Sequence, residues 1–129
     1  MADGIFTFTK RVVANLDEAV RFYRQACGFN EQTEVRATVG GRGIVEIVLK
    51  SSSLAAPPLV LISVSDAPQM VHGDSILAFY TSDLEAFVQR ICDAGGSIVQ
   101  TAESLPKLGV RLAYLRDSGG HLIEVLQKM

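Results

Sequence analysis

The sequence of 129 residues contains no tryptophan, two histidines, two cysteines and no block of basic residues. Cys27 and Cys92 both fall in helix-like segments, so we expect reduced thiols that pack as small apolar groups. The formal net charge of −2 is spread along the chain. This balance argues against nucleic acid or an anionic membrane surface as the main partner.

Long apolar runs are also absent. The longest, "LVLISV" and "GIVEIVL", are far too short to span a membrane, and "MADGIFTFTK" lacks the apolar core of a secretory leader. We therefore expect a cytoplasmic protein. The length and the hydrophobic fraction of 48% are typical of one globular domain, which we place at residues 1–129.

Apolar periodicity predicts two helices. Residues 16–27 and 84–94 carry apolar side chains at three- and four-residue steps. Asn15 is the predicted N-cap of the first helix, and Ser82 or Asp83 that of the second. Strands are predicted at residues 5–13, 30–39, 43–50, 59–64, 75–81, 97–102, 110–116 and 121–127.

The predicted elements form the order βαβββ twice. Leu16 and Leu84 begin the helices, Gly28 and Gly96 follow them, and both pairs are 68 residues apart (84 − 16 and 96 − 28). We therefore predict an α+β fold of two modules, at about residues 4–65 and 74–129. Each module would form a curved sheet with its helix on the convex side. Together the two sheets would form a cup around a central pocket.

Three segments resemble the vicinal-oxygen-chelate superfamily, which includes glyoxalase I, bleomycin-resistance proteins and extradiol dioxygenases. "NLDEAVRFYRQACGF" is similar to the family pattern D-L-x-x-x-x-x-F-Y-x-x-x-L-G-F, and "RDSGGHLIEV" to D-P-D-G-x-x-I-E-L. "LAFYTSDLEAFVQRICDAGG" is similar to the start of the second module. The resemblance covers nearly the whole chain and implies the fold and a homodimer. It does not imply one function, because one fold hosts many chemistries.

The metal enzymes of that family use four ligands, typically His, Glu, His or Gln, and Glu. The resemblance places these positions at Phe8, Leu61, Ile76 and Glu124. Three of these side chains have no lone pair to donate, whereas a catalytic metal normally has about three protein ligands. We therefore expect neither a metal nor another cofactor.

Three other residues bear on this expectation. Strand alternation points His121 away from Glu124, and His72 falls in the predicted junction between the modules. Glu46 would take the second ligand position if residues 43–50 were the last strand of the first module. Even then, two carboxylates without a histidine would be a poor site for Zn, Ni or Fe.

Glu124 lies in the middle of an apolar run, where a carboxylate is costly to bury without compensation. It has three possible roles: bonding to strand neighbours or to an arginine such as Arg111 or Arg36, binding a polar group of a ligand, or acting as a general acid or base. The aromatic residues that either stack on a ligand or pack in the core are Phe6, Tyr80 and Tyr114.

The leading hypothesis is a metal-free, homodimeric protein that sequesters a hydrophobic or aromatic small molecule. The ligand-binding residues would be Phe8, Leu61, Ile76, Tyr80, Arg111 and Glu124. One alternative is a metal-independent lyase or isomerase that uses Glu124 as its general acid or base. A third is a metal-dependent enzyme of the glyoxalase or dioxygenase type whose ligands lie elsewhere in the sequence.

Overall fold

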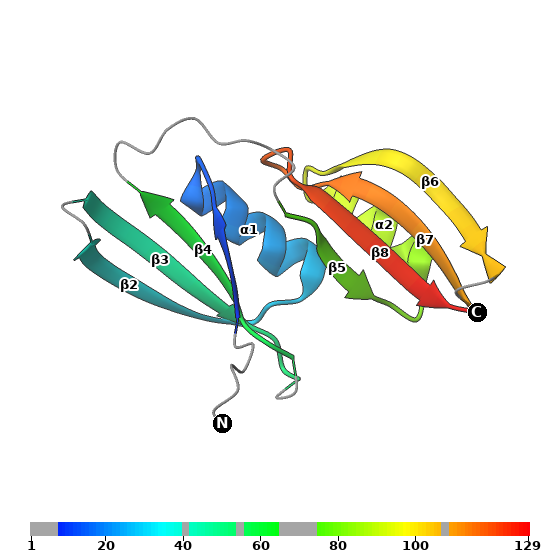
Figure 1. The fold of residues 1–129 in the computed structure, drawn as a ribbon, viewed down its shortest axis with the longest axis horizontal. Coiled ribbons are helices and arrows are strands. Elements are labelled where there is room, and N and C mark those ends of the chain that lie inside the picture. The colour runs from blue at the N-terminus through cyan, green and yellow to red at the C-terminus, as the bar shows by residue number, and fades with distance from the viewer. Residues whose placement is uncertain (1–7, 40–41, 54–55, 65–74, 107–108) are drawn as a thin grey trace, which may run out of the picture.

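The computed structural model describes residues 8–39, 42–53, 56–64, 75–106 and 109–129. The predicted α+β class and the repeated βαβββ order are confirmed (Figure 1). The first module contains β1 (Thr9–Val12), α1 (Leu16–Cys27), β2 (Glu31–Val39), β3 (Arg42–Lys50) and β4 (Leu59–Val64). The second contains β5 (Leu77–Tyr80), α2 (Leu84–Asp93), β6 (Ser97–Leu105), β7 (Val110–Arg116) and β8 (Leu122–Lys128).

Each module forms one four-stranded sheet with the same topology. The strand orders are β1-β4-β3-β2 and β5-β8-β7-β6, so the first strand of each module lies beside the last. These two strands are parallel, and the other neighbours are antiparallel. A parallel neighbour requires a crossover connection, which the rest of each module supplies.

Both helices begin where the sequence predicts; α1 also ends at the predicted residue, and α2 ends one residue earlier, at Asp93. The side chain of Asn15 accepts a hydrogen bond from the Glu18 amide, and that of Asp83 accepts one from the Ala86 amide. Each of these bonds satisfies an amide that the first helical turn leaves without a partner. Gly28 ends α1 in the left-handed region, with φ of 73°, a conformation that glycine adopts at little cost.

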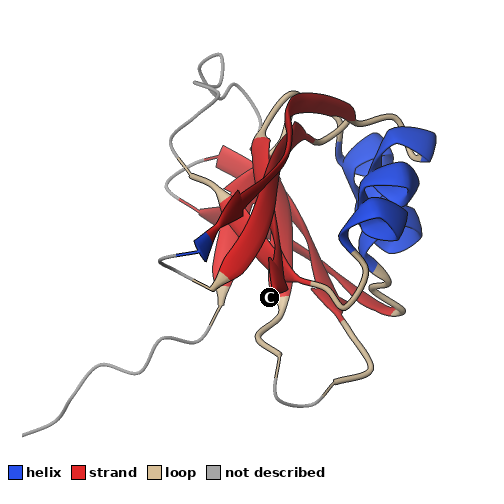
Figure 2. Cartoon of the chain, turned by 90° about the vertical axis from the view of Figure 1, so that its right-hand side faces the viewer, coloured by secondary structure: helices blue, strands red, loops and turns tan. Residues whose placement is uncertain are grey.

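The two helices lie on the same side of the two sheets and contact each other (Figure 2). Their apolar stripes pack on the sheets, and Phe22, Tyr23, Leu84 and Ile91 are almost fully buried there. In the described part of the chain, no helix covers the opposite side of either sheet. We call these two surfaces the open faces. No helix among the described residues is long and apolar enough to cross a membrane.

One strand is longer than predicted. Residues 103–105 were expected in a loop, but β6 continues to Leu105. The ladder to β7 shifts register between Ile98 and Glu103, then resumes with Glu103 opposite Leu112 and continues to Leu105 opposite Val110. The shift lets the strand carry unpaired residues and bend without ending, which the sequence does not signal.

Candidate functional site

Strand register assigns side chains to the open faces. In the second module, Ala78, Glu124 and Tyr114 lie side by side on neighbouring strands. The residues before and after Glu124, Ile123 and Val125, are fully buried against the helices, so Glu124 points to the open face. Its side chain is half-buried and makes no hydrogen bond or ion pair with other described residues.

Leu61 corrects one expectation. We predicted it on the pocket side, but it is fully buried in the core beneath the helices. Register shows the reason: Lys10 lies beside Val60 in the first module as Ala78 lies beside Glu124 in the second. The position equivalent to Glu124 is therefore Val60. The prediction was one residue out, and a slip of one residue moves a side chain to the other face.

Phe8 lies directly before β1, and Ile76 lies directly before β5. Their side chains are 41% and 48% exposed, which leaves apolar surface available beside both open faces. Tyr80, also predicted to bind ligand, is exposed on the open face of the second module, with the Lys128 ammonium 5.6 Å from its ring centre. Phe6 and His72 lie outside the described residues.

Arg111 corrects a second expectation. Along β7, Ala113 and Leu115 face the helices, and Arg111 has the same parity. Its guanidinium forms an ion pair of 2.5 Å with Glu85 of α2, at the far side of the sheet from Glu124. This hydrogen bond lowers the pKa of the Glu85 carboxyl and raises the pKa of Arg111. Arg36 pairs locally with Glu34. Neither arginine compensates Glu124.

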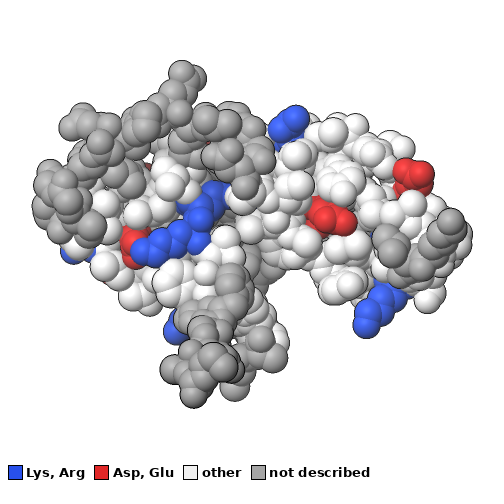
Figure 3. Space-filling model, viewed as in Figure 1, with Lys and Arg blue, Asp and Glu red and all other residues white. Residues whose placement is uncertain are grey.

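The open face of the first module carries a charged pair that was not predicted. The Lys10 ammonium lies 2.5 Å from a carboxylate oxygen of Glu46, whose side chain is 12% exposed. Figure 3 shows blue and red atoms side by side on this part of the surface, where most of the other described atoms are white. Two features of the sequence could have indicated this pair. Glu46 lies in the middle of an apolar strand, and Lys10 is two residues after Phe8, so both side chains share one face of the strand.

The residues at the four ligand positions do not fit a divalent metal. Phe8, Val60 and Ile76 supply no donor atom, which leaves Glu124 alone. No group of three or more potential metal ligands occurs among the described residues. His121 does not add a donor, because it lies in the interior beside Asp117, with Nδ1 3.4 Å from the carboxylate.

A buried polar network joins the two modules. Asp117, in the turn between β7 and β8, accepts hydrogen bonds of 2.6 Å from the Tyr23 hydroxyl and 3.3 Å from Arg11 of β1. Its other oxygen accepts the backbone amides of Gly119 and His121, each at 2.9 Å. Burial and the nearby Asp117 carboxylate raise the pKa of Tyr23 far above its usual value, so the phenol stays protonated and donates.

Arg11 also fixes the start of the second module. Its guanidinium donates to the carbonyl and the hydroxyl of Ser75, each at 3.2 Å. These contacts and the contact between α1 and α2 hold the two sheets in one orientation. Beside the network lies a cavity of about 160 Å³. Its lining includes Asn15, Glu18 and His121.

A second cavity lies on the open face of the second module, at the end of β5. It has a volume of about 400 Å³ and is lined by Tyr80, Thr81, Ser82, Gln127 and Lys128. Glu124 is not part of this lining. Lys128 follows Glu124 by four residues, so its side chain lies further along the same face of β8.

Comparisons with known proteins agree with this architecture. The model of the family "Glyoxalase/Bleomycin resistance protein/Dioxygenase superfamily" matches residues 5–125. No curated protein sequence matches the chain. A glyoxalase family protein from Bacillus cereus has a similar structure, with a TM-score of 0.80 and 19% identity over 100% of this chain and 99% of that one.

Two other solved structures have the same fold. TioX from Micromonospora sp. ML1 gives a TM-score of 0.66 at 21% identity, over 98% of this chain and 100% of that one. An E144Q variant of glyoxalase I from Zea mays gives 0.73 at 18% identity, over 94% of this chain but 46% of the maize protein. At these identities the structures show that the fold is shared, but they do not show that any activity is shared. The family match over nearly the whole chain shows that this protein belongs to the glyoxalase/bleomycin resistance protein/dioxygenase superfamily.

Proposed function

We propose that the chain is a metal-free protein that sequesters a hydrophobic or aromatic small molecule on its open faces. The observation that carries this proposal is the chemistry of the four ligand positions. Three of them are apolar, and the fourth is the half-buried carboxylate of Glu124, which has no partner among the described residues. Sequestration needs affinity alone, so the loss of metal donors does not impair it.

The exposed apolar residues support this function. Phe8, Val12, Val35, Ile76 and Tyr80 are each at least 38% exposed, and register or position places all five at the open faces. Burying one large apolar side chain against a ligand contributes about 1.5–3 kcal/mol. Glu124 would orient the ligand by accepting a hydrogen bond from it, because a half-buried carboxylate is stabilised by a hydrogen-bond donor.

We further propose that the protein acts as a homodimer whose subunits are single domains of two modules. Exposed open faces of this kind need cover, and a second copy has the same two faces to offer. The family name includes a resistance protein beside enzymes, and a protein that only binds its ligand needs no metal donors. Cytoplasmic localisation is part of the same proposal.

The test is a titration of chelator-treated protein with N-phenyl-1-naphthylamine, an uncharged aromatic probe that fluoresces in apolar surroundings. We expect saturable binding. Ile76→Asp should weaken it about tenfold or more, because the aspartate removes apolar contact and adds a charge. Ile98→Asp is the matched control, since both isoleucines are 48% exposed and Ile98 lies on the outer strand β6. Absence of saturable binding, or equal losses in the two variants, would contradict the proposal.

One observation favours a second candidate, a metal-independent lyase or isomerase. Tyr114 lies beside Glu124 in register, so a phenol and a carboxylate share the open face. A carboxylate there could move a proton at a carbon next to a carbonyl group. A product that forms with the wild type and not with Glu124→Gln would support this candidate. Unchanged ligand binding by Glu124→Gln without any product would support sequestration.

A further inference from the structure

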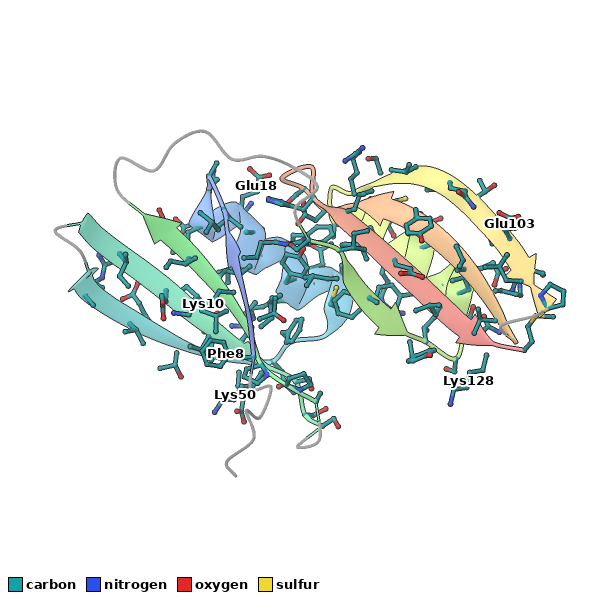
Figure 4. All side chains as sticks on the ribbon, in the orientation of Figure 1. Phe8, Lys10, Glu18, Lys50, Glu103 and Lys128 are labelled. Atoms are coloured by element: carbon teal, nitrogen blue, oxygen red, sulfur yellow. The ribbon has the colours of Figure 1, made fainter. Side chains whose placement is uncertain are left out.

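The open face of the first module combines one ion pair with apolar neighbours. Lys10 and Glu46 lie among Val12, Val60 and Ile62 by register. Val60 and Ile62 are at most 9% exposed, so buried apolar side chains lie on the β4 side of Glu46. The Phe8 ring lies beside the pair, with its centre 5.7 Å from the Lys10 ammonium (Figure 4).

The two charges differ in how far they reach solvent. The side chain of Lys10 is 44% exposed and that of Glu46 only 12%. A ligand that approaches this face therefore meets the ammonium before the carboxylate. An ammonium has three donors, and one of them bonds Glu46 at 2.5 Å. The others can bind acceptor atoms of a ligand.

We propose that Lys10 binds an anionic oxygen of the ligand, such as a carboxylate, sulfonate or phenolate, while Phe8 and its apolar neighbours contact the ligand's rings. Glu46 is a positioning residue that holds the ammonium over the face. This inference rests on the proposed function and narrows the ligand to aromatic acids. A charge-assisted hydrogen bond in a partly desolvated site supplies both affinity and orientation.

Two probes with the same ring system separate the contributions. 8-Anilino-1-naphthalenesulfonate carries a sulfonate, and N-phenyl-1-naphthylamine has the same rings without it. Lys10→Met should lower the affinity for the sulfonate probe about five- to tenfold. Glu46→Gln should raise that affinity, because the glutamine oxygen still accepts a hydrogen bond from the ammonium while the negative charge behind it is gone. Affinity for the uncharged probe should stay within about twofold of the wild type in both variants, since no charge contact is involved.

Arg21→Met is the control. Arg21 is an exposed cation on α1, on the side of the sheets away from the open faces. It should leave the affinity for the sulfonate probe unchanged, and Lys10→Arg should retain it. If Lys10→Met fails to fold because it leaves Glu46 unpaired, the double variant Lys10→Met/Glu46→Gln replaces it and should lose the same preference for the sulfonate probe.

The outcomes distinguish this inference from the proposed function. Equal losses for both probes in Lys10→Met, or an equal loss of affinity for the sulfonate probe in Arg21→Met, would overturn the role of Lys10 and leave ligand binding intact. An effect of Glu46→Gln in the same direction as Lys10→Met would also overturn it, because a purely structural pair behaves that way. Failure of the wild type to bind either probe would overturn both proposals.

Discussion

Asp117→Asn is the substitution that should most disturb the joint between the two modules. Asparagine has the same shape and keeps an oxygen for the amides of Gly119 and His121. It removes the negative charge that faces Arg11, whose side chain is 1% exposed. The guanidinium would then be a buried cation without a counter-ion among the described residues.

The expected loss is large. Removing one partner of a buried ion pair costs about 3–5 kcal/mol, because the other charge remains in the interior. The free energy of unfolding of a domain is about 5–15 kcal/mol, so the variant loses a large share of its stability. Tyr23→Phe should cost less, about 1.5–3 kcal/mol, since it removes the hydroxyl that donates to Asp117 and accepts from Arg11 but leaves the ion pair in place.

The assay is urea unfolding followed by circular dichroism, since the chain has no tryptophan. The midpoint for Asp117→Asn should fall by about 2 M, given slopes of about 1–3 kcal/mol per M for urea. Arg11→Met/Asp117→Asn should be at least about 1 kcal/mol more stable than the sum of the single losses predicts, because the double variant has no orphaned charge. A loss below about 1 kcal/mol in Asp117→Asn, or strict additivity in the double variant, would refute the role of this network.

Three further predictions concern the core and pH. Burial raises the pKa of the Cys27 thiol to about 12, from an ordinary value of 9.0. Its contribution to stability is therefore complete below pH 9 and is lost as pH rises towards 12, by up to about 1.4 kcal/mol per pH unit. Alkaline melting curves should show this loss, and Cys27→Ala should reduce it. Leu61→Ala should lower the free energy of unfolding by about 2–5 kcal/mol and leave the affinity for the uncharged probe unchanged, since Leu61 lies in the core. A weaker affinity without loss of stability would show that Leu61 contacts the ligand. Gly96→Ala should lower the melting temperature, because a Cβ there would lie 2.6 Å from the Arg116 carbonyl oxygen; an unchanged melting temperature would show that the turn can move.

Elements with strong local signals were predictable from the sequence. Both helices carry clear apolar periodicity and a side-chain N-cap, and the repeat of pattern at 68 residues (84 − 16) gave the two modules. Glu124 was recognisable because its strand neighbours are apolar. The end of β6 was missed, since a register shift depends on pairing with β7 and has no local signal.

The side of a strand was harder to predict. Residues 59–62 are all apolar and all buried, so alternation gave no mark to separate Val60 from Leu61. Arg111 was wrongly predicted near Glu124. Its actual partner, Glu85 on α2, is 26 residues away, so no local pattern in the sequence links the two. The bonds of Asp117 to Arg11 and Tyr23 span 106 and 94 residues, and no sequence pattern links such distant positions.

Calorimetric titration of Zn²⁺ and Ni²⁺ into chelator-treated protein tests most directly whether apolar side chains have replaced the metal ligands. The account predicts no stoichiometric binding of either ion at micromolar concentration. It also predicts that Glu124→Gln gives the same flat titration as the wild type. One ion per chain bound by the wild type, and lost in Glu124→Gln, would contradict it.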